Sequence, residues 1–432
     1  METLGPMVRP LGFTPLDDAT FARVCAAVDA RANHAFDFLE RLVEAPSTVG
    51  EEAVAQSLVA EELTRLGLQV MEVGIPESIA SDPDAGVPQT PYAGRANVLA
   101  TTSSSNELDL LINGHIDVVP ADPRGWATSP WSPRIENGWM FGRGAGDMKG
   151  GLAMATLALD ALRSALPSAL ERPVGVLSVI EEECTGNGTL SALRQGVSAD
   201  LVLVTEPTDL ELLIGGTGIV WVDVTIQGSG GHAEVADRVE HPLDVGLRLV
   251  GELEEMGRRV AREHHDIAFD DVAEPYNVNV GLVRAGDWRS SVASVVTLGV
   301  RFGHPRAWTT EEAIDVITSV VTKAIPDDIN VSFSTEGFRA QGYLLDPASP
   351  LVDMVRAAHA ATHGATPATR VGGSTTDARF YLNQAGVPAL CYGPVARHIH
   401  GVDESVNLAS IVAGARTLAH FIAGLDSTRV AP

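Results

Sequence analysis

Imidazole and carboxylate side chains follow apolar segments of this sequence. His115 and Asp117 end the run INGHIDVVP, and the acidic run Glu181–Glu183 follows VGVLSVI. Side chains two residues apart on a strand point to the same face, and open α/β sheets bind ligands at the carboxyl ends of their strands. A histidine beside a carboxylate suits a metal ligand whose ring is oriented by that carboxylate. The alternatives are an exposed loop histidine beside a turn aspartate, and a solvated run of charges.

Three further segments carry groups of the same kind. Asp147 lies in the glycine-rich FGRGAGDMKGG, Glu206 follows the apolar LVLVT, and His398 and His400 lie in RHIHGVDESV. Glycines let the backbone bend sharply and approach an ion. A phosphate-binding loop is not indicated, because the GxxxxGK[ST] spacing is absent and Lys149 is out of frame. A plain strand-to-helix turn at Asp147 and an ordinary strand-end glutamate at Glu206 are the alternatives.

Together these groups form a set that could bind metal. Their spacing is not that of a thiolate zinc site, an HExxH helix or an EF-hand. Two zinc-like ions that share a carboxylate would balance the charge, because Asp147, Glu183 and Glu206 with one hydroxide neutralise two divalent cations. Buried carboxylates without such compensation would be strongly destabilising. The sequence therefore predicts a site for two divalent ions.

The segments that must position these groups alternate between helix and strand. The first helix is expected to be capped at Asp18 or Thr20. Residues 76–94 are rich in Pro, Asp and Ser, and they are expected to form a surface loop. Periodicity predicts further helices over 51–66, 148–164, 188–195, 350–363, 375–384 and 408–424, and strands over 68–75, 97–102, 108–114, 173–181, 200–205 and 387–393. This alternation predicts an α/β domain with a mostly parallel sheet.

A different pattern interrupts this domain. Residues 219–228 alternate like a half-buried strand, and a strand-helix-strand-strand-helix-strand order continues to residue 334. That order is typical of a ferredoxin-like α+β unit. We therefore predict a catalytic domain over 1–214 and 338–432, interrupted by a lid and dimerisation domain over 215–337.

Composition limits the function classes. The chain has 432 residues, 45% hydrophobic and 20% charged, with a net charge of −26. Such a negative surface repels nucleic acids and anionic membranes. Three scattered cysteines without a CxxC motif fit a reducing compartment. Neither a signal peptide at the start METLGPMVRPLGFTPLDDAT nor a run of about 18 apolar residues is found, so a cytoplasmic protein is expected.

The motifs resemble those of a known family. In order, HIDVVP, NGWMFGRGAGDMKGG, EEECTGNGT, TEPT and IHGVDESV resemble the M20 family of co-catalytic zinc peptidases and deacylases. The similarity is greatest to the group of acetylornithine deacetylases and succinyl-diaminopimelate desuccinylases, and it covers nearly the whole chain. It implies hydrolysis of an amide bond in an N-acyl amino acid or small peptide-like substrate. It also implies two Zn²⁺ ions per chain, with Co²⁺ as a substitute, and a homodimer formed through the lid domain.

The resemblance assigns metal ligands residue by residue. Asp147 matches the carboxylate that bridges the two ions. His115 and Glu206 match the other ligands of one ion, and Glu183 and His400 match those of the second. Asp403 and Glu404 follow His400 as in the family pattern H-x-x-D-E. His398 does not fit this pattern and is interpreted either as structural or as a residue that supports a metal ligand.

It also implies the catalytic roles. Asp117 matches the carboxylate that orients the His115 ring, and Glu182 matches the general base that moves a proton from water to the leaving amine. A frame with Glu181 as base and Glu182 as ligand is the alternative. The downstream G-x-G-T, residues 186–189, lies at the family distance only in the first frame.

Two lid residues and one loop match substrate contacts of the family. His232 matches a histidine that crosses a dimer to polarise the scissile carbonyl, and Arg301 matches an arginine that binds a substrate carboxylate. Gly299 replaces the acidic residue usual two positions before that arginine, and WRSSVAS stands where the family has Asn-x-x-Pro. Residues 372–380 resemble a glycine-rich substrate loop. A dipeptidase, carboxypeptidase or ureido-hydrolase, and a metal-free scaffold, are the competing interpretations.

Overall fold

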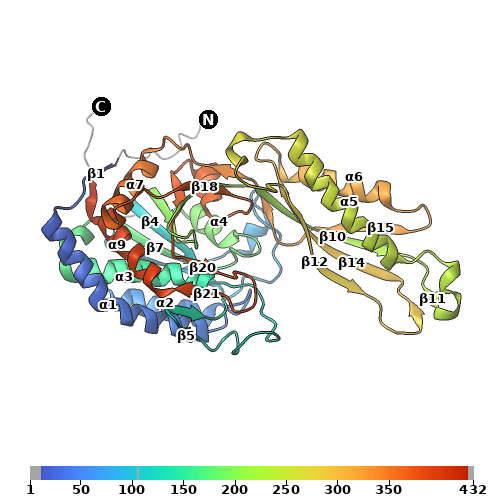
Figure 1. Cartoon of the computed structure of the whole chain (residues 1–432), viewed down its shortest axis with the longest axis horizontal. Helices are drawn as coiled ribbons and strands as arrows, with labels where there is room; N and C mark the ends of the chain where they lie inside the picture. Colours follow the sequence, from blue (N-terminus) through green and yellow to red (C-terminus); the bar gives the residue numbers. More distant parts are fainter. Residues whose placement is uncertain (1–10, 105–106, 427–432) are drawn as a thin grey trace.

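The computed structural model describes residues 11–104 and 107–426. A larger α/β part carries both ends of the described chain, and a smaller elongated part extends from one side of it (Figure 1). The first ten residues, part of the segment expected to lack a signal peptide, lie outside the described residues. The main helices of the larger part are α1 (Asp18–Glu44), α2 (Ala53–Arg65), α3 (Gly150–Ala165), α4 (Asn187–Arg194), α7 (Pro350–His363) and α9 (Leu408–Gly424).

A nine-stranded mixed sheet forms the centre of the larger part. Its order is β17-β9-β19-β8-β4-β7-β3-β2, with β18 beside β9. The strands are β2 (Gln69–Gly74), β3 (Ala96–Thr101), β4 (Leu108–His115), β7 (Val174–Val179), β8 (Ala199–Val204), β9 (Leu212–Gly216), β17 (Tyr343–Leu344), β18 (Thr369–Gly372) and β19 (Ala389–Cys391). The central strands β7, β4, β8 and β19 run parallel, and antiparallel pairs lie towards both edges. The predicted α/β class is thereby confirmed.

Strand β4 shows why the candidate residues meet. All eight of its residues are buried, as its continuous apolar run predicts for a sheet covered on both faces. Because β4, β7 and β8 are parallel neighbours, their carboxyl ends lie at one edge of the sheet. His115 ends β4, and the segments after β7 and β8 carry Glu181–Glu183 and Glu206.

Two local predictions differ from the structure. Helix α1 is capped by Asp17, whose Oδ1 accepts a hydrogen bond from the Thr20 backbone at 3.0 Å, and not by Asp18 or Thr20. The helix predicted over 375–384 begins only at Ala378, after Asp377, and continues as one π-helical segment, Tyr381–Ala385. The Thr376 hydroxyl accepts from the Ala378 backbone, and such side-chain bonds compete with helix formation.

The prediction of a surface loop over residues 76–94 is wrong in part. The segment contains a short 3-10 helix, Glu77–Ser81, and it buries Tyr92 completely. The Tyr92 hydroxyl donates to the carboxylate of Glu181 at 2.7 Å. A segment that composition identifies as a loop therefore reaches the acidic run at the end of β7.

The smaller part confirms the predicted ferredoxin-like order. Its elements are β10 (Gly218–Gln227), α5 (Pro242–Glu263), β12 (Val278–Ala285), β14 (Val295–His304), α6 (Thr310–Ala324) and β15 (Asn330–Ser334). The strands form an antiparallel sheet in the order β12-β14-β10-β15. Buried positions alternate along most of β10, as expected for a half-buried strand. Helix α6 begins with a capping box between Thr309 and Glu312.

The domain boundaries remain predictions. The chain leaves β9 of the larger sheet at Gly216 and enters β10 of the smaller sheet at Gly218, so the predicted boundary at 214/215 lies within β9. The short strand β16 (Arg339–Ala340) still pairs with β10 just beyond the predicted boundary at 337/338. Over residues 11–104 and 107–426, no helix has the length and hydrophobicity that crossing a bilayer requires.

Candidate metal centre

Two imidazoles approach the two oxygens of one carboxylate. The Oδ1 atom of Asp147 lies 3.1 Å from Nε2 of His115, and its Oδ2 lies 3.3 Å from Nε2 of His400. His115 ends β4, whereas His400 follows the short strand β20 (Ala396–Arg397), almost three hundred residues later in the chain. The three side chains therefore form two half-sites joined by Asp147.

The other predicted ligands divide between these half-sites. Oε2 of Glu206 lies 3.8 Å from Nε2 of His115, and Oε2 of Glu183 lies 3.1 Å from Nε2 of His400. Glu182 also belongs to this cluster, because it offers an oxygen within 4.8 Å of ligand atoms of both His115 and Glu206. All five residues predicted as ligands, and the predicted base, thus lie together.

Asp117 is buried between the first histidine and the acidic run. Its two carboxylate oxygens accept hydrogen bonds from the backbone N–H groups of Glu182 and Glu183, both at 3.1 Å. Nδ1 of His115 lies 2.9 Å from the backbone carbonyl of Asp117 and 3.8 Å from its carboxylate. The predicted orienting role stays a prediction, and the closest ring contact is to the carbonyl.

A second buried carboxylate holds the glycine-rich loop that carries Asp147. Glu404 accepts hydrogen bonds from the backbone N–H groups of Gly144 and Gly146, each at 3.0 Å, and from that of Asp147 at 2.9 Å. It also accepts from the guanidinium of Arg143. Glu404 is the last residue of the H-x-x-D-E pattern that starts at His400, but the spacing of this pattern indicates no role for it.

Close backbone contacts position Glu206. A Cβ atom on Gly151 would lie 1.9 Å from the carbonyl oxygen of Thr205, and one on Gly393 would lie 2.2 Å from that of Glu206. Real Cβ atoms do not approach other atoms so closely, so only glycine fits at either position. These glycines allow α3 and the segment after β19 to pack against the end of β8.

Lys149 and Glu181 take no part in the ligand cluster. The Lys149 ammonium is completely buried and donates to the carbonyls of Leu42 and Ala45, at 2.7 and 3.1 Å, which accounts for this lysine without a phosphate. The Glu181 carboxylate is completely buried and accepts from Arg95 and Tyr92. Because these hydrogen bonds occupy the Glu181 carboxylate, Glu182 is the better candidate for the base.

The donor set fits two divalent ions. For tetrahedral zinc with bonds of about 2.1 Å, neighbouring donor atoms are about 3.4 Å apart, and the four distances given above for the half-sites lie between 3.1 and 3.8 Å. Burial and neighbouring carboxylates raise the pKa of Glu182 and Glu206 well above the usual range. Glu183 raises the pKa of His400 to about 11. Ionised carboxylates in this cluster would place an excess of negative charge in a buried site, and bound cations would neutralise that charge.

The structure does not bring His232 to this cluster within one chain. His232 belongs to β11 (Gly231–His232), which Figure 1 shows at the outer end of the smaller part. The ring is exposed, and its Nδ1 accepts from the Glu234 backbone at 3.1 Å. Any role in catalysis would therefore require a second chain or a large movement.

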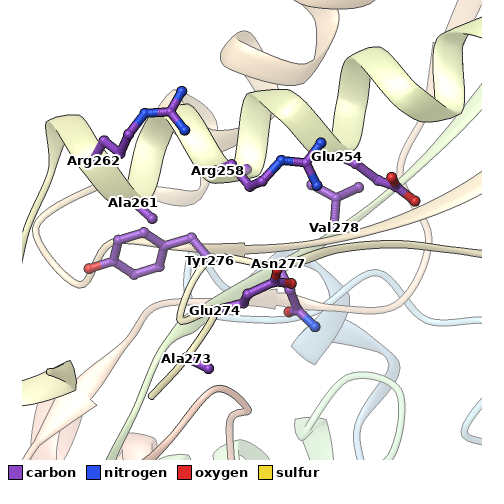
Figure 2. A pocket seen from close by; sticks show the side chains of 10 residues that line it. Glu254, Arg258, Ala261, Arg262, Ala273, Glu274, Tyr276, Asn277 and Val278 are labelled. Atoms are coloured by element: carbon purple, nitrogen blue, oxygen red, sulfur yellow. The ribbon is translucent and has the colours of Figure 1, made fainter. Parts of the chain in front are cut away.

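Arg301 lies at the junction of the two parts. Its guanidinium donates to the carbonyl of Gly373, in the glycine-rich loop, at 2.9 Å and to the side chain of Asn277. Asn277 also lines a groove of about 490 Å³ between α5 and residues 273–278 (Figure 2). The other side chains of this groove include Arg258 and Glu274, and no predicted site residue lines it. Arg301 thus contacts the predicted substrate loop, whereas the groove lies apart from the metal ligands.

A family of known proteins matches the part of the chain that contains this cluster. The model of peptidase family M20/M25/M40 matches residues 111–424, which carry all the predicted ligands. The chain belongs to this family, a class of metallohydrolases.

The relatives by sequence and by structure differ in their reported activities. The chain is 29% identical to a succinyl-diaminopimelate desuccinylase of Methylorubrum populi, over 86% of this chain and 92% of the relative. It is 28% identical to that of Paracoccus denitrificans, over 85% and 91%. Similar solved structures include the di-peptidase Dug1p of Saccharomyces cerevisiae (TM-score 0.74, 16% identity, 93% of this chain and 98% of that chain). Human carnosine dipeptidase 1 is similar too (TM-score 0.73, 14% identity, 94% and 99%).

Proposed function

We propose that this protein is a di-zinc hydrolase that cleaves the amide bond of an N-acyl amino acid or a small peptide-like substrate. The observation that carries the proposal is the position of Asp147, whose two carboxylate oxygens each face one imidazole. His115 and Glu206 would hold one ion, and Glu183 and His400 the other, with Asp147 shared. Two bound ions would polarise the scissile carbonyl and acidify the attacking water.

The chain's own residues supply the proton transfer and the geometry. Glu182 accepts a proton from the attacking water and returns it to the leaving amine, which is the work of a general base and then acid. The backbone N–H of Glu182 donates a hydrogen bond to the Asp117 carboxylate, which holds the Glu182 backbone in position. Arg301 would bind a substrate carboxylate after its contacts with the Asn277 side chain and the Gly373 carbonyl are broken.

A second function, hydrolysis of dipeptides, is favoured by the resemblance to solved dipeptidase structures, whereas the relatives by sequence favour deacylation. A panel of N-acetyl and N-succinyl amino acids, dipeptides and ureido acids, assayed with Zn²⁺ or Co²⁺ supplied, separates these functions. The proposal expects the highest kcat/KM on an acylated amino acid. Faster hydrolysis of dipeptides would replace it with the second function, and absence of both activity and bound metal would indicate a scaffold.

The two neighbouring histidines offer a test of the ligand set. Replacing His400 by Ala should lower bound zinc from two ions per chain toward one, because the second half-site then keeps only Glu183 and Asp147. His398 is the matched control, since it is exposed in the same loop and faces no predicted ligand in the described contacts. Elemental analysis after dialysis measures the stoichiometry. Equal loss in both variants would show that the ligand set is wrong.

A further inference from the structure

The acidic run at the end of β7 starts with an unusual backbone conformation. Glu181 has φ of +64°, in the left-handed region that residues with a side chain rarely adopt. Its carbonyl accepts from the backbone N–H groups of Thr185 and Gly186, so a tight turn follows the strand. Such conformations persist where the surroundings hold them, and they are frequent at functional sites.

Three donors hold the Glu181 side chain. The carboxylate is completely buried, and it accepts hydrogen bonds from Nη1 of Arg95 at 2.6 Å, the Tyr92 hydroxyl at 2.7 Å and the Thr185 hydroxyl at 2.8 Å. Arg95 and Tyr92 come from the segment before β3, far from β7 in the sequence. The orientation of Glu181 therefore depends on a separate part of the chain.

Arg95 is itself fixed. Its Nε donates to Glu52 at 3.1 Å, its Nη2 donates to the other oxygen of the same carboxylate, and its Nη1 donates to the Thr90 hydroxyl at 2.7 Å. The Arg95 side chain is 10% exposed and that of Glu52 is 3% exposed. A planar guanidinium with this many partners is held in one orientation.

The other side of the run is held as well. The Asp117 carboxylate accepts from the N–H groups of Glu182 and Glu183, as described above. The segment Glu181–Glu183 is thus fixed by side-chain contacts at its start and by backbone contacts at its end. The first set of contacts holds Glu181, and the second holds the backbone of the predicted base, Glu182, and of one predicted ligand, Glu183.

We propose that Arg95 and Tyr92 are positioning residues for the reaction: through Glu181 they hold Glu182 and Glu183 at the distances that proton transfer and metal binding need. This inference rests on the proposed function, because it assigns the base and the ligand to Glu182 and Glu183. Displacement of a reacting group by about 1 Å can lower a rate by about 10²-fold. Substitution of groups that orient metal ligands lowers metal affinity or activity by about 10- to 100-fold.

The same two strands provide a matched control. At the opposite ends of β4 and β7, Arg172 pairs with Asp109 at 2.7 Å, and their side chains are 16% and 5% exposed. Arg172→Met therefore removes a largely buried arginine–carboxylate pair from the same sheet without touching the acidic run. Breaking a buried pair should lower the stability of Arg172→Met and, to a greater extent, of Arg95→Met, because Arg95 pairs with both Glu52 and Glu181. A loss of kcat and zinc affinity in folded Arg95→Met but not in folded Arg172→Met would therefore not come from the loss of a buried pair alone.

The test compares Arg95→Met, Arg95→Lys and Tyr92→Phe with Arg172→Met in the full chain. At saturating Zn²⁺, kcat on the best substrate of the panel should fall at least about tenfold in Arg95→Met, with KM nearly unchanged. Arg95→Lys should recover part of that loss, because it keeps the charge toward Glu181. Competition with a zinc chelator should show about tenfold weaker zinc binding in Arg95→Met and no change in Arg172→Met. Tyr92→Phe removes one donor to Glu181, so it should lower kcat and zinc affinity less than Arg95→Met does. This variant still tests the proposal if Arg95→Met does not fold.

The two readouts separate this inference from the proposed function. Equal kcat and zinc affinity in Arg172→Met and in the Arg95 and Tyr92 variants would overturn the positioning role, even if the wild-type enzyme is active. If the wild type hydrolyses nothing in the panel, the proposed function fails. Zinc affinity then decides the positioning role alone, since weaker binding confined to the Arg95 and Tyr92 variants supports it and unchanged binding overturns it.

Discussion

Replacing Glu182 by Gln is expected to lower kcat by about 10²- to 10⁴-fold while two metal ions remain bound. The amide keeps the shape of the side chain but cannot accept a proton. The backbone N–H of Glu182 still donates to Asp117, so the segment should keep its position. Steady-state kinetics together with elemental analysis of the same sample checks both halves of this expectation.

Glu181→Gln is the comparison variant. The Glu181 carboxylate is bound by Arg95, Tyr92 and Thr185. Glu181→Gln should therefore weaken the positioning of Glu182 and Glu183, and it should lower kcat much less than Glu182→Gln does. An almost fully active Glu182→Gln enzyme beside an inactive Glu181→Gln enzyme would contradict the assignment. The base would then be Glu181, and Glu182 would be the ligand.

The sequence could predict the candidate site because parallel strands bring their carboxyl ends together. The apolar runs of β4 and β8 predicted two buried strands of a mostly parallel sheet, so His115 and Glu206 were expected at its carboxyl edge. Their pairing as ligands of one ion came from the resemblance to a family. Asp147 and His400 lie in irregular segments, and periodicity could not place them. Their assignment came from the resemblance to a family.

The supporting contacts could not be predicted in the same way. Glu404 binds three backbone N–H groups of a loop about 260 residues away, and no local pattern encodes such a contact. Tyr92 and Arg95 lie in or beside a segment whose composition resembles a surface loop. Their side chains donate hydrogen bonds to Glu181, and such tertiary contacts leave no periodic trace in the sequence.

A second chain is expected to complete the active site. The predicted strand at 219–228 is β10, which lies between β14 and β15, so it cannot itself be an unpaired edge. One edge of this sheet is β12, where Val283 is 55% exposed, and the other edge is formed by β15 and the short strand β16. Edge strands with free backbone groups can pair with a second copy. We therefore expect a homodimer through an edge of this sheet.

His232 is suited to act across such a dimer. Its Nδ1 accepts a hydrogen bond from the Glu234 backbone, so a neutral ring carries its proton on Nε2 and can donate to a substrate carbonyl. If each His232 serves the site of the partner chain, His232→Ala and Glu182→Gln damage different components of one shared site. Each variant alone should be nearly inactive.

Mixing the two inactive variants should then restore activity. In a dimer with two-fold symmetry, a heterodimer of these variants has one site with both substitutions and one site with neither. Random exchange of equal amounts should therefore approach roughly a quarter of wild-type activity per total site, because half of the dimers are heterodimers and half of their sites are intact. Subunit exchange is followed independently with differently tagged chains, and the unmixed variants are the controls. A mixture that exchanges chains but stays inactive would show that His232 acts within its own chain or has no catalytic role. Light scattering that finds only a monomer under assay conditions would contradict the shared site directly.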